Sequence, residues 1–592
     1  MSLRKFPGST LPLDTCRAIL WAAGLFLCFS GTDPLFAQAA NSTVEATVTI
    51  RGTVINSDTH LPVGRALVYS SDNRFAKLTD DEGQFEFKLP GSETDQTLRS
   101  GMGVNQAYSS LGGVVSQTVY SGIYFMARKP GYFQSQAEQP TIAPSGVTEI
   151  TISLIPEARI IGRVNSSAND GLEKIQVEVY RRTVQTGHGQ WMPLRTVPTR
   201  ANGEFRFADL PEGDYKLFTH EHMDNDPLKF NPRGPLLGYP PIYYPSAADF
   251  ETAATIHLKP GELFSVTLTP SLREYFPVKL GVMNAWLQGG FRITVAPLGH
   301  RGPGYSLGYD RRENAIVGML PNGNYTAEVS KYEENGATGI LNFTVNGAPE
   351  EGSGVVMTPN ASIEVHVNEE LTKDESARTG NANNPPTTPV NMTDLMLTNL
   401  MLVSQEEFGS WGQSESGKTG NSAEKRFVFE NVAPGRYLVR AGCLPSGYVA
   451  AISSGGRNLL RQPLVVGLGA SIAPIEVTVR DDGAQIAGTI ENWPAPGQNA
   501  AMRTSSSGAV LALPTADSSG QFCQQWVNPN SEFTFMQMAP GEYRLIALDH
   551  MPEDLEYENS EAMRKYESKG QLLRLVAGQH EHLRLTMDGG SN

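Results

Sequence analysis

One stretch of the sequence decides the fold: Phe205-Arg206-Phe207-Ala208-Asp209-Leu210-Pro211-Glu212-Gly213-Asp214-Tyr215. Successive side chains of a strand point to opposite faces, so Phe205 and Phe207 place two aromatic rings on the same face. The Pro-x-Gly that follows predicts a turn, and Tyr215 then begins the partner strand. Each ring buries on the order of 150–250 Å². The stretch therefore predicts a β-hairpin with a tyrosine packed at its turn, similar to a tyrosine corner.

The same pattern recurs three more times along the chain. Its tyrosines are Tyr215, Tyr325, Tyr437 and Tyr543, at intervals of 110, 112 and 106 residues. A fixed period indicates one structural unit that is copied several times. Strand-like segments that begin around Gly52, Gly162 and Gly488 match one another, and the first of them predicts a further unit that lacks the Gly-x-Tyr.

The composition predicts an all-β protein: a tandem array of about five β-sandwich domains with little helix. The chain has 592 residues, of which 59 are Gly and 39 are Pro. Such turn-rich sequences with short alternating strands are typical of β-sandwiches. The expected division is a signal peptide over residues 1–39, then units over residues 40–156, 157–270, 271–360, 361–481 and 482–592. The second unit carries an aromatic and Pro-rich insertion, the fourth a disordered loop over residues 369–391, and the fifth a short helix near residues 560–568.

The N-terminal segment predicts export. Arg4, Lys5 and Arg17 flank an apolar stretch from Ala18 to Phe29, and Ala37-Gln38-Ala39 fits a small-x-small cleavage site. The expected location is periplasmic, cell-surface or extracellular, with no membrane insertion of the mature chain; an uncleaved anchor is the alternative. The net charge of −15 argues against nucleic acid as a partner, because phosphate backbones repel such a chain.

The first unit resembles the carboxypeptidase regulatory-like domain, a transthyretin-like, immunoglobulin-like sandwich of the carbohydrate-binding-like fold. The resemblance is carried by Gly52-Thr53-Val54, Leu61-Pro62-Val63, Ala66-Leu67-Val68, Thr79 to Phe87, and Lys129-Pro130-Gly131-Tyr132. The second and fifth units match at their first strands and at Asn202 to Tyr215 and Glu532 to Tyr543. The chain is similar to repeat proteins of soil bacteria. The resemblance implies non-catalytic modules, some of which bind glycans.

Two motif matches have the wrong context for catalysis. Gly412 to Thr419 matches the phosphate-loop pattern, but a strand is predicted after it, where that motif requires a helix. Gly304-Tyr305-Ser306-Leu307-Gly308 matches a hydrolase nucleophile elbow, and it too is followed by a predicted strand. We therefore expect neither an enzyme nor a cofactor.

Two further groups are candidates for metal binding and for a disulfide. His220, His222 and Asp224 gather metal-ligand side chains after the Tyr215 strand, and a solvated polar loop is the alternative reading. Cys443 and Cys523 are the cysteines that remain after the predicted cleavage. In an oxidising compartment they either pair or stay free, and the sequence leaves both open.

Long connections follow the Gly-x-Tyr strands and predict a binding face. The loop from Phe230 to Phe250 combines aromatic side chains with prolines, and the fourth and fifth units have long connections at the same place. Exposed rings on rigid loops stack on sugars; the alternative is a loop that folds its rings over its own sandwich. The candidate ligand-binding residues are Tyr239, Tyr243, Tyr244, Phe250, Tyr448 and Tyr557.

The leading functional prediction is an exported non-catalytic protein that binds carbohydrate or other cell-envelope components through these loops. Its expected partners are a polysaccharide or envelope glycan, or envelope proteins. The alternatives are a purely structural spacer or assembly protein of the envelope, and a hydrolase accessory protein or unrecognised hydrolase.

Overall fold

The computed structural model describes residues 47–90, 104–110, 113–119, 124–134, 147–185, 187–224, 236–284, 290–331, 336–372, 399–408, 414–416, 418–419, 427–444, 446–492, 508–515, 518, 520–528, 530–548, 555–557, 559 and 561–588. The predicted signal peptide lies outside these residues, as does most of the loop predicted over 369–391. Within the described residues, no helix is long and apolar enough to cross a membrane.

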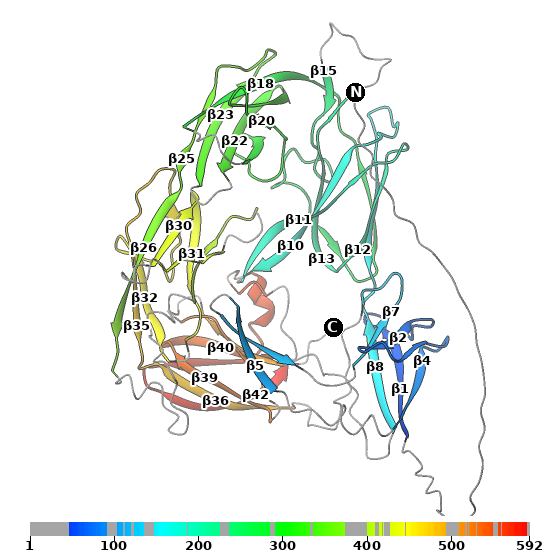
Figure 1. Ribbon diagram of the computed structural model, residues 1–592, viewed down its shortest axis with the longest axis vertical. Coiled ribbons are helices and arrows are strands. Elements are labelled where there is room, and N and C mark those ends of the chain that lie inside the picture. The colour runs from blue at the N-terminus through cyan, green and yellow to red at the C-terminus, as the bar shows by residue number, and fades with distance from the viewer. Residues whose placement is uncertain are drawn as a thin grey trace, which may run out of the picture. The chain divides into compact units, whose positions relative to one another are not determined.

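The first two units each contain two sheets around one hydrophobic core (Figure 1). In the first unit the sheets are β4-β1-β8 and β3-β2-β7. Their bounds are β1 Thr47–Asn56, β2 Leu67–Ser70, β3 Ala76–Leu78, β4 Gln84–Pro90, β7 Phe125–Arg128 and β8 Val147–Leu154; β5 Val104–Ser110 and β6 Gly113–Val119 form a separate hairpin. In the second unit the sheets are β12-β9-β17 and β11-β10-β13-β16. Their bounds are β9 Ala158–Val164, β10 Gln176–Gln185, β11 His188–Pro198, β12 Glu204–Leu210, β13 Gly213–Thr219, β16 Ile256–Leu258 and β17 Leu263–Leu268.

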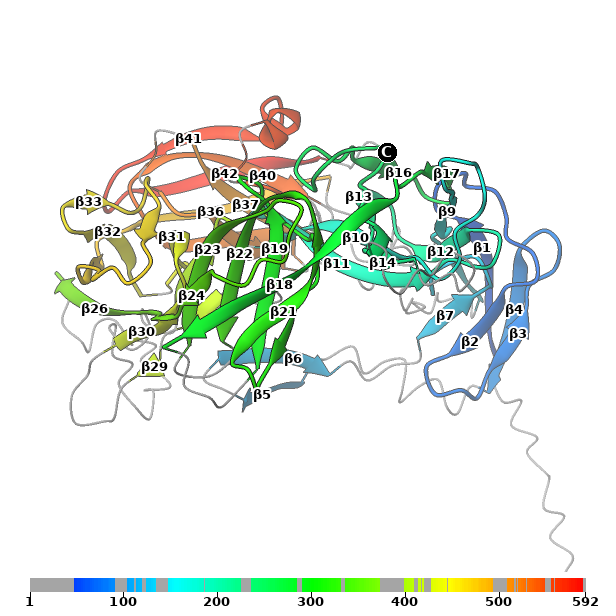
Figure 2. The same cartoon turned by 90° about the horizontal axis from the view of Figure 1, so that it is seen from above.

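The third unit shows the two layers most clearly, with β18 and β21 in front of β19, β22 and β23 in Figure 2. One sheet has the order β14-β15-β18-β21-β20 with β24 beside β18, and the other β19-β22-β23-β25. The bounds are β14 His222–Met223, β15 Leu236–Tyr239, β18 Arg273–Met283, β19 Phe291–Pro297, β20 Gly308–Asp310, β21 Ala315–Pro321, β22 Gly323–Lys331, β23 Ala337–Val345, β24 Gly354–Val356 and β25 Thr358–Pro359. Because β14 and β15 precede residue 271, the insertion of the second unit extends a sheet of the third.

The fourth unit again has two sheets, β29-β30-β26-β35-β32-β33 and β28-β27-β31-β34, around its own core. The fifth unit also has its own core, but a short parallel pairing of β40 with β42 joins its strands into one sheet, β38-β37-β40-β42-β36-β39 with β41 beside β40. The fourth has β26 Ala361–Glu370, β27 Leu400–Ser404, β28 Ser414–Ser416, β29 Lys418–Thr419, β30 Phe427–Val432, β31 Gly435–Ala441, β32 Tyr448–Ser454, β33 Arg457–Asn458, β34 Leu464–Val466 and β35 Ile475–Arg480. The fifth has β36 Ala484–Glu491, β37 Ala509–Pro514, β38 Cys523–Trp526, β39 Glu532–Met538, β40 Gly541–Leu548, β41 Gln571–Leu575 and β42 His580–Asp588. The predicted short helix corresponds to a 3₁₀ helix, η2, at Ala562–Tyr566. The prediction of an all-β tandem array of β-sandwiches is confirmed.

One strand arrangement is common to all five units. The first strand of each unit lies between an antiparallel and a parallel neighbour. In the second to fifth units the antiparallel neighbour is the strand before the Gly-x-Tyr turn, and in the first unit it is β4, the strand that contains Phe85 and Phe87. The parallel neighbour comes from the C-terminal part of each unit. The pairs are β1 with β4 and β8, β9 with β12 and β17, β18 with β21 and β24, β26 with β30 and β35, and β36 with β39 and β42.

A glycine in the first strand makes room for the aromatic strand in three units. Gly162 lies opposite Phe205, and a Cβ atom at Gly162 would come 2.3 Å from the Cζ atom of that ring. Gly52 with Phe85, and Gly488 with Phe533, repeat the same pairing. An aromatic ring that covers a glycine on a neighbouring strand fixes the register between them.

The predicted tyrosine corner is present in every Gly-x-Tyr copy. The hydroxyl of Tyr215 donates a hydrogen bond of 2.6 Å to the carbonyl oxygen of Pro211, four residues earlier. Tyr325, Tyr437 and Tyr543 donate in the same way to the carbonyls of Pro321, Ala433 and Ala539. All four rings are buried, with at most 3% of their surface exposed. These tyrosines are therefore structural residues that close the turn.

Candidate functional site

Strand β13 is buried on both faces. One face belongs to the core of the sandwich, and the long loop of the second unit covers the other. Tyr215 and Leu217 point into the core of the sandwich. Lys216 and Phe218 belong to the other face and are also buried, at 6% and 0% exposure. Phe218 packs with Trp191, Tyr243, Phe250 and Ala253 in a second apolar cluster, which we call the loop cluster.

The candidate ligand-binding rings of this loop are used to build the loop cluster. Tyr243 stacks on Phe218 with ring centroids 5.3 Å apart, and Phe250 is 1% exposed. Tyr239 is 8% exposed and packs against the core of the second unit. The prediction that these three rings are exposed is wrong, because Tyr243 and Phe250 pack over β13 and Tyr239 packs against the core of the second unit. The alternative reading, a loop that covers its own sandwich, is correct.

The remaining candidate rings also lie in packing contacts. Tyr244 is half-buried and packs edge-on against Phe264, with centroids 6.0 Å apart. Tyr448 is 5% exposed, and its hydroxyl donates a hydrogen bond of 2.9 Å to Asp482. Exposure was therefore predicted wrongly for Tyr448 as well, because its ring belongs to strand β32 and faces inward. Tyr557 is half-buried and stacks on Phe522 at 4.1 Å.

The loops also reach other units of the chain. The hydroxyl of Tyr243 donates a hydrogen bond of 2.6 Å to the carbonyl of Pro303 in the third unit. The Phe250 ring meets Phe408 of the fourth unit edge-on at 5.2 Å. From the fifth unit, the Tyr557 ring lies against Gly187 of the second, where a Cβ atom would come 2.4 Å from it.

The cysteines form such a link as well. Cys443 and Cys523 are disulfide-bonded with their Cα atoms 5.8 Å apart, so the bond joins the fourth unit to the fifth. The sequence left pairing and free thiols open, and the structure decides for pairing.

The predicted metal ligands do not converge on one point. His220 forms a 2.7 Å contact with the Glu178 carboxylate, and its ring lies 5.0 Å from that of Phe218. His222 lies on β14, and burial lowers the pKa of its imidazole. Within the described residues, His220, His222 and Asp224 are not among the groups whose ligand atoms approach closely enough to share an ion.

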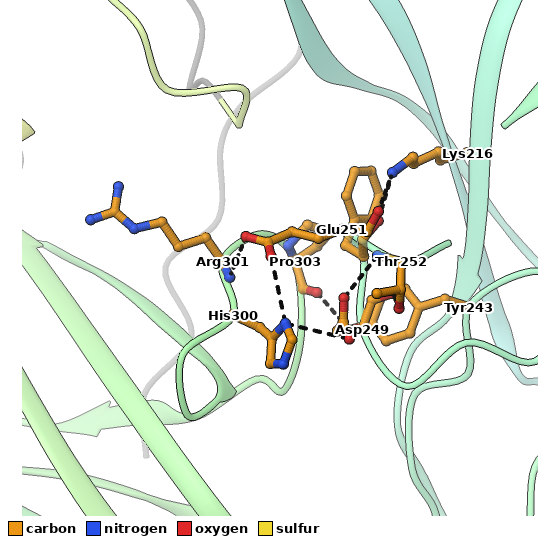
Figure 3. A network of polar contacts seen from close by, with 9 residues as sticks. Lys216, Tyr243, Asp249, Glu251, Thr252, His300, Arg301 and Pro303 are labelled. Carbon is orange, nitrogen blue, oxygen red and sulfur yellow. Dashed lines mark hydrogen bonds and ion pairs between the residues drawn. The ribbon is translucent and has the colours of Figure 1, made fainter. Parts of the chain in front are cut away.

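A different set of ligand-type side chains does converge, and Figure 3 shows it: Asp249, Glu251 and His300. Their ligand atoms all lie within 4.8 Å of one another. The Nδ1 atom of His300 is 3.4 Å from the Asp249 Oδ2 atom and 3.5 Å from the Glu251 Oε2 atom. Asp249 and Glu251 come from the loop of the second unit, and His300 from a turn after β19 of the third. We call these three residues the carboxylate–histidine cluster.

Both carboxylates of this cluster accept a backbone hydrogen bond through their second oxygen atom. The Oδ1 atom of Asp249 accepts a hydrogen bond from the Thr252 backbone N–H at 2.9 Å, and the Asp249 side chain is only 7% exposed. The Oε1 atom of Glu251 accepts a hydrogen bond of 3.2 Å from the Arg301 backbone N–H. The Arg301 side chain pairs with Glu406 of the fourth unit.

Two further ionisable groups lie at the same junction, the buried Lys216 and the half-buried Glu221. Burial lowers the pKa of Lys216, whose Nζ donates to the carbonyls of Phe250 and Glu251 at 2.8 and 3.0 Å. Burial also raises the pKa of Glu221 to about 7. The Oε1 atom of Glu221 accepts a hydrogen bond of 3.0 Å from the Ser306 N–H of the third unit. Its Oε2 atom is buried and has no hydrogen-bond partner among the described residues.

Sequence reasoning missed the carboxylate–histidine cluster. Asp249 and Glu251 are two residues apart, but His300 lies in another unit, so no spacing pattern connects them. Lys216 and Phe218 did carry a signal: a phenylalanine on the nominally outer face of β13 predicts that something covers this face.

Comparisons with known proteins find similarity to solved structures. No family model matches it, and no curated protein matches it. Among solved structures, it is similar to the shaft pilin SpaA from Lactobacillus rhamnosus GG, at 11% identity over 38% of this chain and 97% of that one, with a TM-score of 0.17. It is also similar to a streptococcal ancillary pilin, at 13% identity over 53% and 98% of the two chains and a TM-score of 0.17. The Bacillus anthracis TIE protein matches at 9% identity over 91% of this chain and 67% of that one, with a TM-score of 0.13. Similarity at this level carries no information about activity or partners, and the fold assignment rests on the strands and sheets themselves.

Proposed function

We propose that this chain is an exported, non-catalytic structural protein of the cell envelope, in which the loops after the Gly-x-Tyr strands hold the β-sandwich units together. The observation that carries the proposal is the position of the aromatic side chains in these loops. Four of the six candidate rings are buried and the other two are half-buried, and all six pack in contacts within or between units. A binding face would expose such rings to solvent.

The second and fourth units are joined by hydrogen bonds to backbone carbonyls beside a buried tryptophan ring, contacts that hold two domains in a defined orientation. The Trp191 backbone N–H donates a hydrogen bond of 2.7 Å to the carbonyl of Glu407, and the Gln190 side-chain amide donates one of 3.2 Å to that of Ser404. Trp191 is 5% exposed. Burial of a large aromatic ring beside paired backbone groups stabilises a defined interface.

The fifth unit forms an ion pair with the second unit and a disulfide bond with the fourth. Arg182 of the second unit pairs with Glu556 at 2.9 Å, with side-chain exposures of 32% and 9%. The disulfide between Cys443 and Cys523 closes a separation of 80 residues across two units. A covalent link between units suits a protein that works outside the cell under mechanical or proteolytic stress.

The proposal predicts that the chain from Ala40 sediments with an isolated envelope fraction, while neutral polysaccharides do not slow its migration in native affinity gels. Tyr244→Ala and Tyr557→Ala provide the decisive comparison, because these rings are only half-buried. If a neutral polysaccharide slows the chain, and both substitutions abolish the effect, the loops bind sugar and the structural proposal fails.

A second role, binding of an acidic glycan, is favoured by one observation on the second unit. A groove of about 780 Å³ follows the outer face of the β12-β9-β17 sheet. Arg163, Arg200 and Arg206 line it together with Glu204 and with the hydroxyl-bearing Ser265 and Thr267. Arg163 pairs with Glu204 at 2.8 Å. In a chain of net charge −15, the two other arginines beside hydroxyl groups are complementary to uronate sugars.

This second role has its own test in the same gels. Retardation by a polyuronate is expected to decrease at least fivefold in Arg206→Ala, because a charge-assisted hydrogen bond is worth about 1.5–3 kcal/mol. Arg457→Ala, an exposed arginine of β33, is the control. Equal effects of the two substitutions would indicate non-specific charge attraction and would exclude the groove. The resemblance to carboxypeptidase regulatory-like domains stays a prediction.

A further inference from the structure

We propose that the carboxylate–histidine cluster, Asp249, Glu251 and His300, binds a divalent metal ion, and that zinc fits it best. The ion would be shared by the loop of the second unit and a turn of the third. This inference goes beyond the proposed structural role, because it concerns a ligand and not the packing of the units.

The first argument is the length of the contacts. Where a histidine of this chain is hydrogen-bonded to a carboxylate, the atoms are closer: 2.6 Å for His257 with Asp214, and 2.7 Å for His220 with Glu178. Charge-assisted N–H···O hydrogen bonds are about 2.7–2.9 Å long. The 3.4 and 3.5 Å contacts of His300 are longer than these. They match the separation of about 3.4 Å between neighbouring ligand atoms around a tetrahedral zinc ion with bonds of about 2.0–2.2 Å.

The second argument is that the facing atoms lack hydrogen bonds. The Nδ1 atom of His300 is buried and has no hydrogen-bond partner among the described residues. The side chain of Asp249 is more than nine-tenths buried, and its Oδ1 atom is occupied by the Thr252 N–H. Its Oδ2 atom lies 3.4 Å from the Nδ1 atom of His300, a contact that Figure 3 marks with a dashed line. A divalent cation held by these three atoms would supply the counter-charge for the Asp249 and Glu251 carboxylates and a partner for the buried Nδ1 atom of His300.

The donor set selects the ion. One imidazole nitrogen with two carboxylate oxygens suits zinc, whereas calcium and magnesium prefer oxygen ligands alone. Three protein ligands leave a fourth position of the tetrahedron for water. Lys216 and Arg301 bring positive charge to the same junction, but Lys216 donates to backbone carbonyls and the Arg301 guanidinium pairs with Glu406. Both cations are thus directed away from the three ligand atoms.

The competing explanation is a protonated His300 that pairs with both carboxylates without any metal. The experiment that separates the two uses the chain from Ala40, stripped with EDTA and dialysed against ZnCl₂. We expect one zinc ion per chain by elemental analysis. Substitution of Co²⁺ for zinc is expected to give the visible absorption of a four-coordinate complex, a readout that does not depend on envelope binding.

Glu251→Gln and His300→Ala are expected to weaken zinc binding at least tenfold in titration calorimetry. The matched control is His366→Ala, because the two ring nitrogens of His366 contact different carboxylates, Glu476 at 2.9 Å and Glu364 at 3.6 Å. The absence of zinc binding at micromolar concentration would overturn the proposal. So would unchanged binding in His300→Ala, or equal loss in His366→Ala. If His300→Ala does not fold, the half-exposed Glu251 decides the question through Glu251→Gln.

Discussion

Replacing Tyr543 by phenylalanine removes a single oxygen atom from the core of the fifth unit. The ring is 0% exposed, and its hydroxyl donates to the carbonyl of Ala539 at 2.9 Å. The same hydroxyl accepts a hydrogen bond of 3.3 Å from the Gln521 backbone N–H. Tyr543→Phe therefore leaves two backbone groups without a partner where water does not reach the ring.

The cost follows from these two groups. A neutral hydrogen bond contributes about 1 kcal/mol, and a buried polar group left without a partner costs about 1–3 kcal/mol. The bond from Gln521 is long, so we expect a total of about 1.5–2 kcal/mol in the free energy of unfolding. That loss corresponds to a shift of about 6–9 °C in the melting temperature of a domain of this size.

Hydrogen–deuterium exchange measures the effect within one unit of a multidomain chain. Amides of Gly541–Leu548 in β40 are expected to exchange at least tenfold faster in Tyr543→Phe, because each 1.4 kcal/mol lost multiplies the open population by ten. Amides of Gly213–Thr219 in β13 should not change. Tyr69→Phe is the control substitution, since the described residues offer the Tyr69 hydroxyl no hydrogen-bond partner. A change below twofold in β40 would refute the structural role assigned to all four tyrosines.

Three further predictions concern other parts of the chain. Cys443→Ser should cost about 4.5 kcal/mol in urea unfolding by the loop-entropy relation for a separation of 80 residues, and the difference should vanish in a reducing agent. Gly162→Ala should destabilise the second unit by about 1–3 kcal/mol in thermal melts, because the new methyl group would collide with Phe205; Gly352→Ala, where space is open, is the control. Burial raises the pKa of Glu221 to about 7, so its contribution is present at acidic pH and is lost as pH rises to 7 and above. Glu221→Gln should therefore remove up to about 3 kcal/mol of the decline in unfolding free energy between pH 4.5 and 8, and an unchanged pH profile would contradict this.

The candidate site was only partly predictable from the sequence. The residue types of its loop are local information, but the burial of each residue depends on parts of the chain that are distant in sequence. The aromatic character of the loop was evident from Tyr243 and Phe250, but their exposure depends on a covered face of β13 and on Phe408, which is 158 residues further along the chain. Alternation within a strand reports two faces and does not say which of them another part of the chain will cover. The aromatic pattern therefore identified the rings of the loop, but it did not show that most of them pack against other parts of the chain.

The sequence by itself determined the repeating unit. The Tyr215 hydroxyl reaches a carbonyl four residues away, and Phe205 lies across from a glycine whose place in the first strand recurs in three units. These interactions depend on turn geometry and on the two-residue period of a strand, which short stretches of sequence encode. The tertiary structure alone decided the pairing of Cys443 with Cys523 and the meeting of Asp249 with His300. Such contacts join separate units, and their geometry is set by how whole sandwiches pack, which no local pattern of residues specifies.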